Sequence, residues 1–210
     1  MKTILLTSSG KFVTDGDMSF LDKPISRMKI AYITTAAKGA RDNSYVTACK
    51  QRMTELNFDF EEIDIEGKNE DKLMKMLSDK EVIFVEGGNT SYLLKAVRES
   101  SFDKVVKNLI DRGVIYIGSS AGSYIACPTI EVSTWKKPGE EKERFGVTDL
   151  TAMNIVPFLV KAHYTPEQKE FLKEKIKNAK YPVKILTDEQ ALLVRNGKVK
   201  LLGRGEEIRI

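Results

Sequence analysis

The sequence contains few of the residues that hold metals or build disulfide frameworks. Its 210 residues include two cysteines, Cys49 and Cys127, and a single histidine. Two cysteines so far apart in the chain give neither a disulfide framework nor the paired spacing of a metal site. The chain also lacks a G-x-G-x-x-G fingerprint and a P-loop. The sequence therefore predicts no cofactor and no metal.

Long apolar runs and one-sided charge are also missing. The opening residues, MKTILLTSSG, hold one lysine and an apolar stretch too short for a signal peptide, and a membrane span would need about 20 residues. The 34 basic and 30 acidic residues are interleaved and leave a net charge of +4. Because nucleic-acid binders usually concentrate basic charge on one face, this pattern favours a solvated surface. We predict a cytoplasmic protein that binds neither nucleic acid nor a membrane.

What the chain does contain is an alternation of short apolar runs and helical patterns. Asn196-Gly197 between two apolar runs is a strong signal for a C-terminal β-hairpin. Strands that alternate with helices form parallel β-α-β units, whose sheet is covered on both faces. We expect one α/β domain over residues 1–210. The other predicted strands are 3–7, 29–34, 60–65, 81–85, 114–117, 155–160 and 183–186.

Three helices are predicted from apolar side chains at helical spacing. The first covers residues 45–56 and the second residues 102–110. The third lies around residues 171–176, where Thr165 precedes it and Gln168 stands in the capping-box position.

The strongest functional signal is the run of small residues at 118–122, Gly-Ser-Ser-Ala-Gly, between a predicted strand and a predicted helix. Ligands of open α/β sheets bind beyond the carboxyl ends of the strands, and G-x-S-x-G in this context is typical of a nucleophile elbow. The glycines allow a sharp turn that holds Ser120 at the strand tip, so Ser120 is the candidate nucleophile and Ser119 and Ser123 are bystanders. A phosphate cradle at a helix N-terminus is the alternative.

The only histidine, His163, follows the predicted strand 155–160 and precedes a helix beginning near Pro166. A serine hydroxyl needs a base that titrates near neutral pH, and only His163 offers one without a large perturbation. We expect His163 and Ser120 at the same edge of one sheet. This joint placement favours a serine–histidine pair over a structural or merely exposed histidine.

Gly87-Gly88, in the segment FVEGGNTSYLL, follows another predicted strand. Glycines there would let backbone N–H groups face a ligand without side chains in the way. In an acyl-transfer enzyme, such an N–H and that of Ala121 would form an oxyanion hole. An ordinary loop leading into a helix that Asn89, Thr90 or Ser91 caps is the alternative.

The fourth strand end carries Thr187-Asp188-Glu189, directly after the strand 183–186. A histidine base needs an acid that fixes its tautomer and stabilises the imidazolium. Asp188 lies at the required edge of the sheet, although a turn before a hairpin also favours aspartate for local reasons. The spacing does not exclude Glu189.

With these residues in view, the sequence resembles the peptidase E family (S51) of serine peptidases, the aspartyl dipeptidases and their cyanophycinase relatives. FVEGGNTSYLL, GSSAGSYIACPTI, the histidine after NIVPFLV and the closing ILTDEQALLVRNG carry the resemblance, which covers most of the chain. It implies a three-layer α/β/α sandwich similar to class I glutamine amidotransferases, with a mostly parallel central sheet. It also implies roles for the site residues: Ser120 as nucleophile, His163 as general base, Asp188 as acid, and the backbone of Gly88 and Ala121 as oxyanion hole.

The chain departs from the family pattern at two places. Asp188 aligns where many relatives have glutamate in a Pro-Glu-Gly context. After CPTI the aspartyl dipeptidases typically continue with Thr-Asn-Asp, whereas this chain reads EVSTWKKPG, with Trp135 in the acidic place. A preference for N-terminal aspartate therefore does not carry over directly. The cations available for an aspartyl side chain include Lys136, Lys137 and Arg144.

We predict a cytoplasmic, metal-independent serine peptidase that hydrolyses dipeptides or very small peptides, with N-terminal aspartate as one option. An esterase or amidase on a small acyl compound is the first alternative. A non-catalytic module that holds an anion at Ser120 and Gly87-Gly88 is the second. The charged segment 136–145, KKPGEEKERF, is predicted to be a surface loop. The sequence leaves open its role, the substrate and the oligomeric state.

Overall fold

The centre of the protein is a seven-stranded sheet with the strand order β3-β2-β4-β5-β1-β8-β9. The computed structural model describes residues 1–210, with the side chain of Glu141 left out. The five strands from β3 to β1 in this order are parallel, and β8 and β9 add an antiparallel hairpin beside β1. The strands are β1 (Thr3–Thr7), β2 (Lys29–Ile33), β3 (Asp59–Ile63), β4 (Val82–Val85), β5 (Ile115–Ser119), β8 (Gln190–Arg195) and β9 (Lys198–Gly203).

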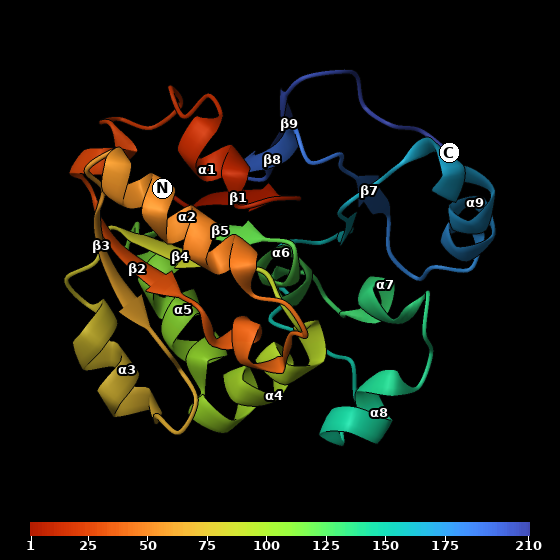
Figure 1. The fold of residues 1–210 in the computed structure, drawn as a ribbon, viewed down its shortest axis with the longest axis horizontal. Coiled ribbons are helices and arrows are strands. Elements are labelled where there is room, and N and C mark those ends of the chain that lie inside the picture. The colour runs from red at the N-terminus through yellow and green to blue at the C-terminus, as the bar shows by residue number, and fades with distance from the viewer.

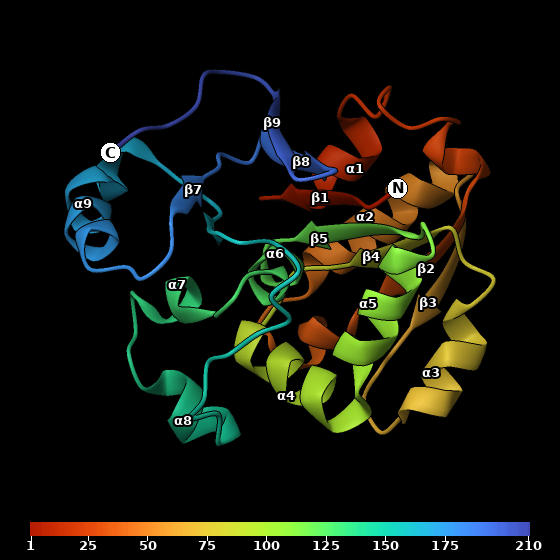
Figure 2. The same ribbon diagram turned by 180° about the vertical axis from the view of Figure 1, so that it is seen from behind.

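Helices cover both faces of this sheet, so the predicted three-layer α/β/α sandwich is confirmed (Figures 1 and 2). Each face has its own apolar cluster, one under α1 and α2 and a larger one under α3 to α6. The first face carries α1 (Lys11–Asp15) and α2 (Ser44–Glu55). The second carries α3 (Glu70–Leu77), α4 (Thr90–Ser100), α5 (Phe102–Asp111) and α6 (Ala121–Ala126). Short 3-10 turns lie at η1 (Ile25–Arg27) and η2 (Thr35–Gly39).

Beyond the carboxyl ends of the parallel strands lies a smaller subassembly (Figure 1). It contains a separate two-stranded parallel sheet of β6 (Leu159–Lys161) and β7 (Val183–Ile185). Near this sheet lie α7 (Glu131–Thr134), η3 (Pro166–Gln168) and α9 (Lys169–Lys177), whereas α8 (Glu140–Phe145) lies apart from it, beside α4.

The expectation that strands 155–160 and 183–186 join the central sheet is therefore wrong. Residues 155–158 form bends, because Asn154 has a left-handed φ of 52° and Pro157 has no N–H to donate to a ladder. The remaining strand pairs only with β7. The position beside β1 that either strand would need is taken by β8.

The hairpin prediction is confirmed: Asn196 and Gly197 have φ of 49° and 77° and connect β8 to β9. The capping box before the third helix is not formed. Thr165 makes no side-chain cap, and Pro166–Gln168 form the turn η3 before α9 begins. The side chain of Gln168 instead donates to the carbonyl of His163 at 3.2 Å.

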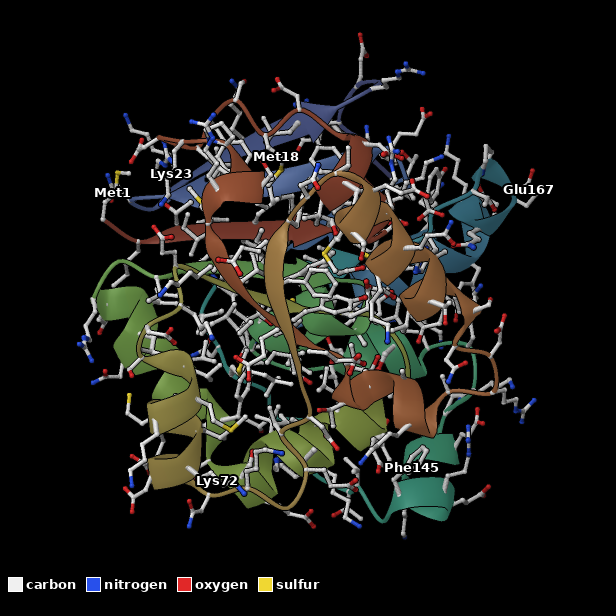
Figure 3. The ribbon with its side chains drawn as sticks, turned by 60° about the vertical axis from the view of Figure 1, so that its left-hand side comes forward. Met1, Met18, Lys23, Lys72, Phe145 and Glu167 are labelled. Carbon is white, nitrogen blue, oxygen red and sulfur yellow. The ribbon has the colours of Figure 1, made fainter. Side chains whose placement is uncertain are left out.

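The segment 136–145 is not entirely loop, because its second half forms α8. An i,i+4 ion pair of 3.0 Å between Glu140 and Arg144 supports this helix. Phe145 packs edge-on against the ring of Tyr92, with 5.7 Å between centroids, and so holds α8 against α4. Figure 3 shows Phe145 at this end of the molecule.

Charged side chains surround the fold on all sides, as the interleaved charges predict. Lys23, Lys72 and Glu167 all lie exposed on the surface and come from separate parts of it (Figure 3). Within the described chain, no helix is both long enough and apolar enough to cross a bilayer.

Candidate active site

The turn between β5 and α6 holds Ser120 in an uncommon backbone conformation, with φ of 46° and ψ of −105°. The glycines that flank it are sterically required. A Cβ on Gly118 would lie 2.5 Å from the carbonyl oxygen of Gly122, and one on Gly122 would lie 2.1 Å from that of Val85. The G-x-S-x-G pattern therefore marks a real strand-to-helix elbow, with Ser120 at its tip.

The position of β1 brings other residues to the same place. Thr7, the last residue of β1, pairs with Ser119 on one side and with Ala191 on the other. Its carbonyl accepts a hydrogen bond of 3.0 Å from the N–H of Ser120. The residues just beyond β1, just beyond β5 and just before β8 consequently meet at one edge of the sheet.

Three of the predicted site residues form a continuous hydrogen-bonded chain at this edge. The Nε2 of His163 lies 2.9 Å from the Oγ of Ser120, and its Nδ1 lies 2.7 Å from the Oδ1 of Asp188. A neutral imidazole with its proton on Nδ1 would donate to Asp188 and accept the serine proton at Nε2. His163 reaches this point from the smaller sheet, where the N–H of Tyr164 donates to the carbonyl of Leu186 at 3.0 Å.

The choice between the two candidate acids follows from where their carboxylates lie. The hydrogen bond with His163 lowers the pKa of Asp188, and a second bond from Ser8 adds to this effect against an opposing contribution from burial. Glu189 points elsewhere, with its Oε1 3.8 Å from Arg204. Asp188 is therefore the carboxylate that faces His163, and it is ionised at neutral pH.

Ser8, which was not among the predicted site residues, contacts both Asp188 and His163. Its hydroxyl donates to the Oδ1 of Asp188 at 2.5 Å and accepts from the backbone N–H of His163 at 2.7 Å. Ser8 is fully buried. The signal was available, since Ser8 directly follows the strand 3–7 and so lies at a carboxyl strand end like the other candidates.

The predicted oxyanion donors also lie beside Ser120. A Cβ on Gly87 would lie 3.2 Å from the Cβ of Ser120, so this loop passes close to the elbow. Gly88 has φ of 141°, and a Cβ there would collide with the carbonyl of Ala36 at 2.4 Å. Among the described residues, no acceptor binds the N–H of Gly88 or that of Ala121, so both are available to a ligand.

Gly87, Gly88, Ser120 and His163 line a pocket of about 860 Å³. The pocket extends from Ser120 and His163 between α1 and α2. It also reaches Lys137, Glu140 and Arg144, so the segment 136–145 borders the site. Trp135 instead packs partly buried against the larger apolar cluster.

Neither cysteine is suited to be a nucleophile. Burial raises the pKa of both Cys49 and Cys127 to about 12, so both thiols are protonated at neutral pH. The Sγ of Cys127 donates to the carbonyl of Ser123 at 3.3 Å, away from the elbow tip. In the part of the chain that the structure describes, no group of three His, Cys, Asp or Glu side chains is placed to hold a metal ion.

Lys161, two residues before His163, is only 6% exposed. Its ammonium group donates to the carbonyl of Ala162. Burial, reinforced by the charge of Lys136 and opposed by that of Asp188, lowers the pKa of Lys161 to about 8. The folded protein therefore releases this proton more readily than the unfolded chain, whose lysine titrates near 10.5.

The consequence is a pH-dependent stability that a Lys161→Met variant should reveal. Below pH 8 both states hold the proton and the wild type bears the full cost of burying it, so the variant should be more stable by about 1–3 kcal/mol. Between pH 8 and 10.5 the unfolded state binds more protons, so the wild type gains stability and the difference shrinks. Urea unfolding of both proteins from pH 6 to 10 measures this. A difference independent of pH would contradict the assignment.

Similar proteins are found for almost the whole chain. The model of peptidase family S51 matches residues 4–202. An uncharacterized peptidase of Listeria monocytogenes, Lmo0363, is 29% identical over 205 residues, which is 95% of this chain and 97% of that protein. A peptidase E of Nostoc is 31% identical over 138 residues, 65% of this chain and 52% of its own length.

Solved structures show the same fold. A crystal structure of a candidate peptidase E from Listeria monocytogenes superposes with a TM-score of 0.84 at 28% identity, and covers 98% of this chain and 100% of that one. A peptidase from an acI-B1 actinobacterium gives a TM-score of 0.65 at 14% identity, with coverage of 100% and 97%. The second likeness concerns the fold alone.

Proposed function

Because this chain belongs to peptidase family S51, we propose that it is a serine peptidase that hydrolyses dipeptides or very short peptides. The observation that carries the proposal is the hydrogen-bonded chain from Ser120 through His163 to Asp188. A serine, an imidazole and a carboxylate in this order are the parts of an acyl-transfer site.

In the proposed reaction the Oγ of Ser120 attacks the scissile carbonyl carbon while Nε2 of His163 takes the hydroxyl proton. The negative oxygen that forms accepts hydrogen bonds from the N–H groups of Gly88 and Ala121. The imidazolium then donates its proton to the leaving amine, the C–N bond breaks, and an acyl ester remains on Ser120. Water, deprotonated by His163, hydrolyses this ester. Asp188 keeps the proton on Nδ1 and stabilises the imidazolium.

The charges at one side of the pocket support a short substrate. Arg41, Lys137 and Arg144 lie 3.9, 3.6 and 3.0 Å from carboxylate oxygens of Glu140. Three cations around this carboxylate leave an excess of positive charge in the lining. The free carboxylate of a dipeptide would be attracted there, whereas a long chain carries no such charge near its scissile bond. We also propose the cytoplasm as the compartment, since both cysteines are free thiols.

The direct test is hydrolysis of a dipeptide panel with acidic, basic and neutral N-terminal residues, by the wild type and by Ser120→Ala. Turnover that depends on Ser120 supports the proposal. Ser120-dependent turnover of small esters or amides only would replace the peptidase with the esterase or amidase alternative.

Ser8 is proposed to be a positioning residue for Asp188 and His163. Ser8→Ala should lower kcat by about 10- to 100-fold with little change in KM. The substitution removes the hydroxyl that holds Asp188 and His163 in place, and it changes no charge in the pocket. Ser9→Ala is the matched control, since Ser9 also lines the pocket but its hydroxyl accepts only from the nearby N–H of Lys11. A rise in KM at unchanged kcat would mean that Ser8 binds substrate instead.

A further inference from the structure

One buried carboxylate of the pocket takes no part in the proposed chemistry. Glu86 directly follows β4, lines the pocket and is 2% exposed. Its Oε2 accepts a hydrogen bond of 2.8 Å from the hydroxyl of Tyr32, and its Oε1 accepts one of 2.7 Å from the N–H of Gly87. These donors hold the carboxylate in one orientation.

Glu86 is buried without a counter-charge. No ion pair joins it to any described Lys, Arg or His, whereas Glu140, Asp188 and Glu189 each have a cationic or imidazole partner. Its hydrogen-bond donors, the hydroxyl of Tyr32 and the N–H of Gly87, are neutral, and so is the thiol of Cys49 beside it. Removing an anion from water without a cation to offset the loss of hydration is costly. A cationic ligand would supply the missing charge.

Glu86 lines the same pocket as the nucleophile Ser120. A Cβ on Gly10 would lie 2.6 Å from Oε2 of Glu86, so the carboxylate can occupy this place only because residue 10 has no side chain. Gly87, the next residue, passes directly beside Ser120. Glu86 is therefore the neighbour in sequence of the residue that passes the elbow, and its carboxylate lies beside Gly10 at the start of α1.

The neighbours of Glu86 fit an apolar stem with a charged tip. Tyr45 and Cys49 of α2 line the same part of the pocket and interact electrostatically with Glu86. The hydroxyl of Tyr45 donates to the carbonyl of Gly87 at 3.2 Å, so its ring stands beside the loop. Lysine and arginine side chains pair an apolar stem with a cationic end in this way.

We propose that Glu86 binds the cationic side chain of an N-terminal lysine or arginine of the substrate, so that the enzyme prefers basic over acidic N-terminal residues. The inference rests on the proposed peptidase function. A side chain suits this carboxylate better than the substrate's α-amino group, because the α-amino group is held next to the scissile carbonyl at Ser120 and Glu86 lies at the buried floor. The cations around Glu140 then receive the opposite, carboxylate end.

Dipeptides with uncharged analogues of lysine and arginine show how much the positive charge of the side chain contributes. The wild type is assayed on Lys-Leu against norleucyl-Leu, on Arg-Leu against citrullyl-Leu, and on Asp-Leu. We expect kcat/KM to be about 10- to 100-fold higher for each basic peptide than for its neutral counterpart, the range typical of a hydrogen bond to a charged group. Glu86→Gln should bring these ratios close to one. Glutamine can accept from the N–H of Gly87 through its oxygen, and its NH2 group can donate to the hydroxyl oxygen of Tyr32, so the variant removes the charge and reverses one hydrogen bond.

The matched control is Asp42→Asn, which removes another pocket-lining carboxylate whose oxygens accept from Ser44, and it should leave the ratios unchanged. Equal rates on basic and neutral peptides, or a preference for Asp-Leu, would overturn the role of Glu86 while Ser120-dependent turnover upholds the peptidase. If no peptide is hydrolysed in a Ser120-dependent manner, the proposed function fails and this inference with it. If Glu86→Gln does not fold, the wild-type ratios decide.

Discussion

Replacement of Ser120 by alanine is expected to lower kcat for dipeptide hydrolysis by roughly 10⁴- to 10⁶-fold. The substitution removes the only atom that forms the acyl bond, while the loop at Gly88, the N–H of Ala121 and the pocket stay in place. KM should change little, because the hydroxyl contributes to the reaction more than to binding. Steady-state assays at substrate concentrations around KM, with purified protein, measure both parameters.

Ser119→Ala is the matched control for this experiment. Ser119 is the preceding residue, is buried at the end of β5 and also lines the pocket, yet its hydroxyl has no part in the chain from Ser120 to Asp188. Its replacement should leave kcat within a few-fold of the wild type. A Ser120→Ala variant that retained more than about one hundredth of the activity would exclude Ser120 as the nucleophile. Thermal unfolding of both variants shows whether the elbow is intact.

The second largest effect is expected for Asp188→Asn, with a fall in kcat of about 10³- to 10⁴-fold. An asparagine amide placed against Nδ1 favours the imidazole tautomer with its proton on Nε2, which cannot accept the proton of Ser120. Because Ser8 and His163 contact the same oxygen of Asp188, an amide nitrogen facing Nδ1 also loses the hydrogen bond that Ser8 donates. The assay is kcat against pH for the wild type and the variant.

Glu189→Gln serves as the control, because Glu189 is paired with Arg204. This substitution should change kcat by less than about three-fold. The lowered pKa of Asp188 also determines how this residue can affect the pH dependence of activity. Its carboxylate stays ionised to a lower pH than that of a free aspartate, so wild-type activity lost on acidification above pH 5 must come from another group. A large effect of Glu189→Gln with none for Asp188→Asn would reverse the assignment of the acid.

Features determined by adjacent residues could be predicted from the sequence. The elbow at Ser120 follows from two glycines whose absent side chains make room for the carbonyls of Gly122 and Val85. The hairpin follows from Asn196-Gly197, which accept left-handed φ values. The alternation of strands and helices determined the layered sheet in the same way, since side-chain periodicity is a local property.

The tertiary structure decided which distant segments meet. The pairing of β1 with both β5 and β8 placed Ser8 beside Asp188 and His163. It also directed the carboxylate of Asp188 toward His163 and that of Glu189 away from it, although the two acids are neighbours in the chain. Hydrophobic patterns report which residues are buried but not which strand pairs with which, so the second sheet at β6 and β7 was not foreseen. The burial of Glu86 likewise depends on Tyr32 of the adjacent strand β2 and on Gly10 beyond β1, two contacts that no local pattern contains.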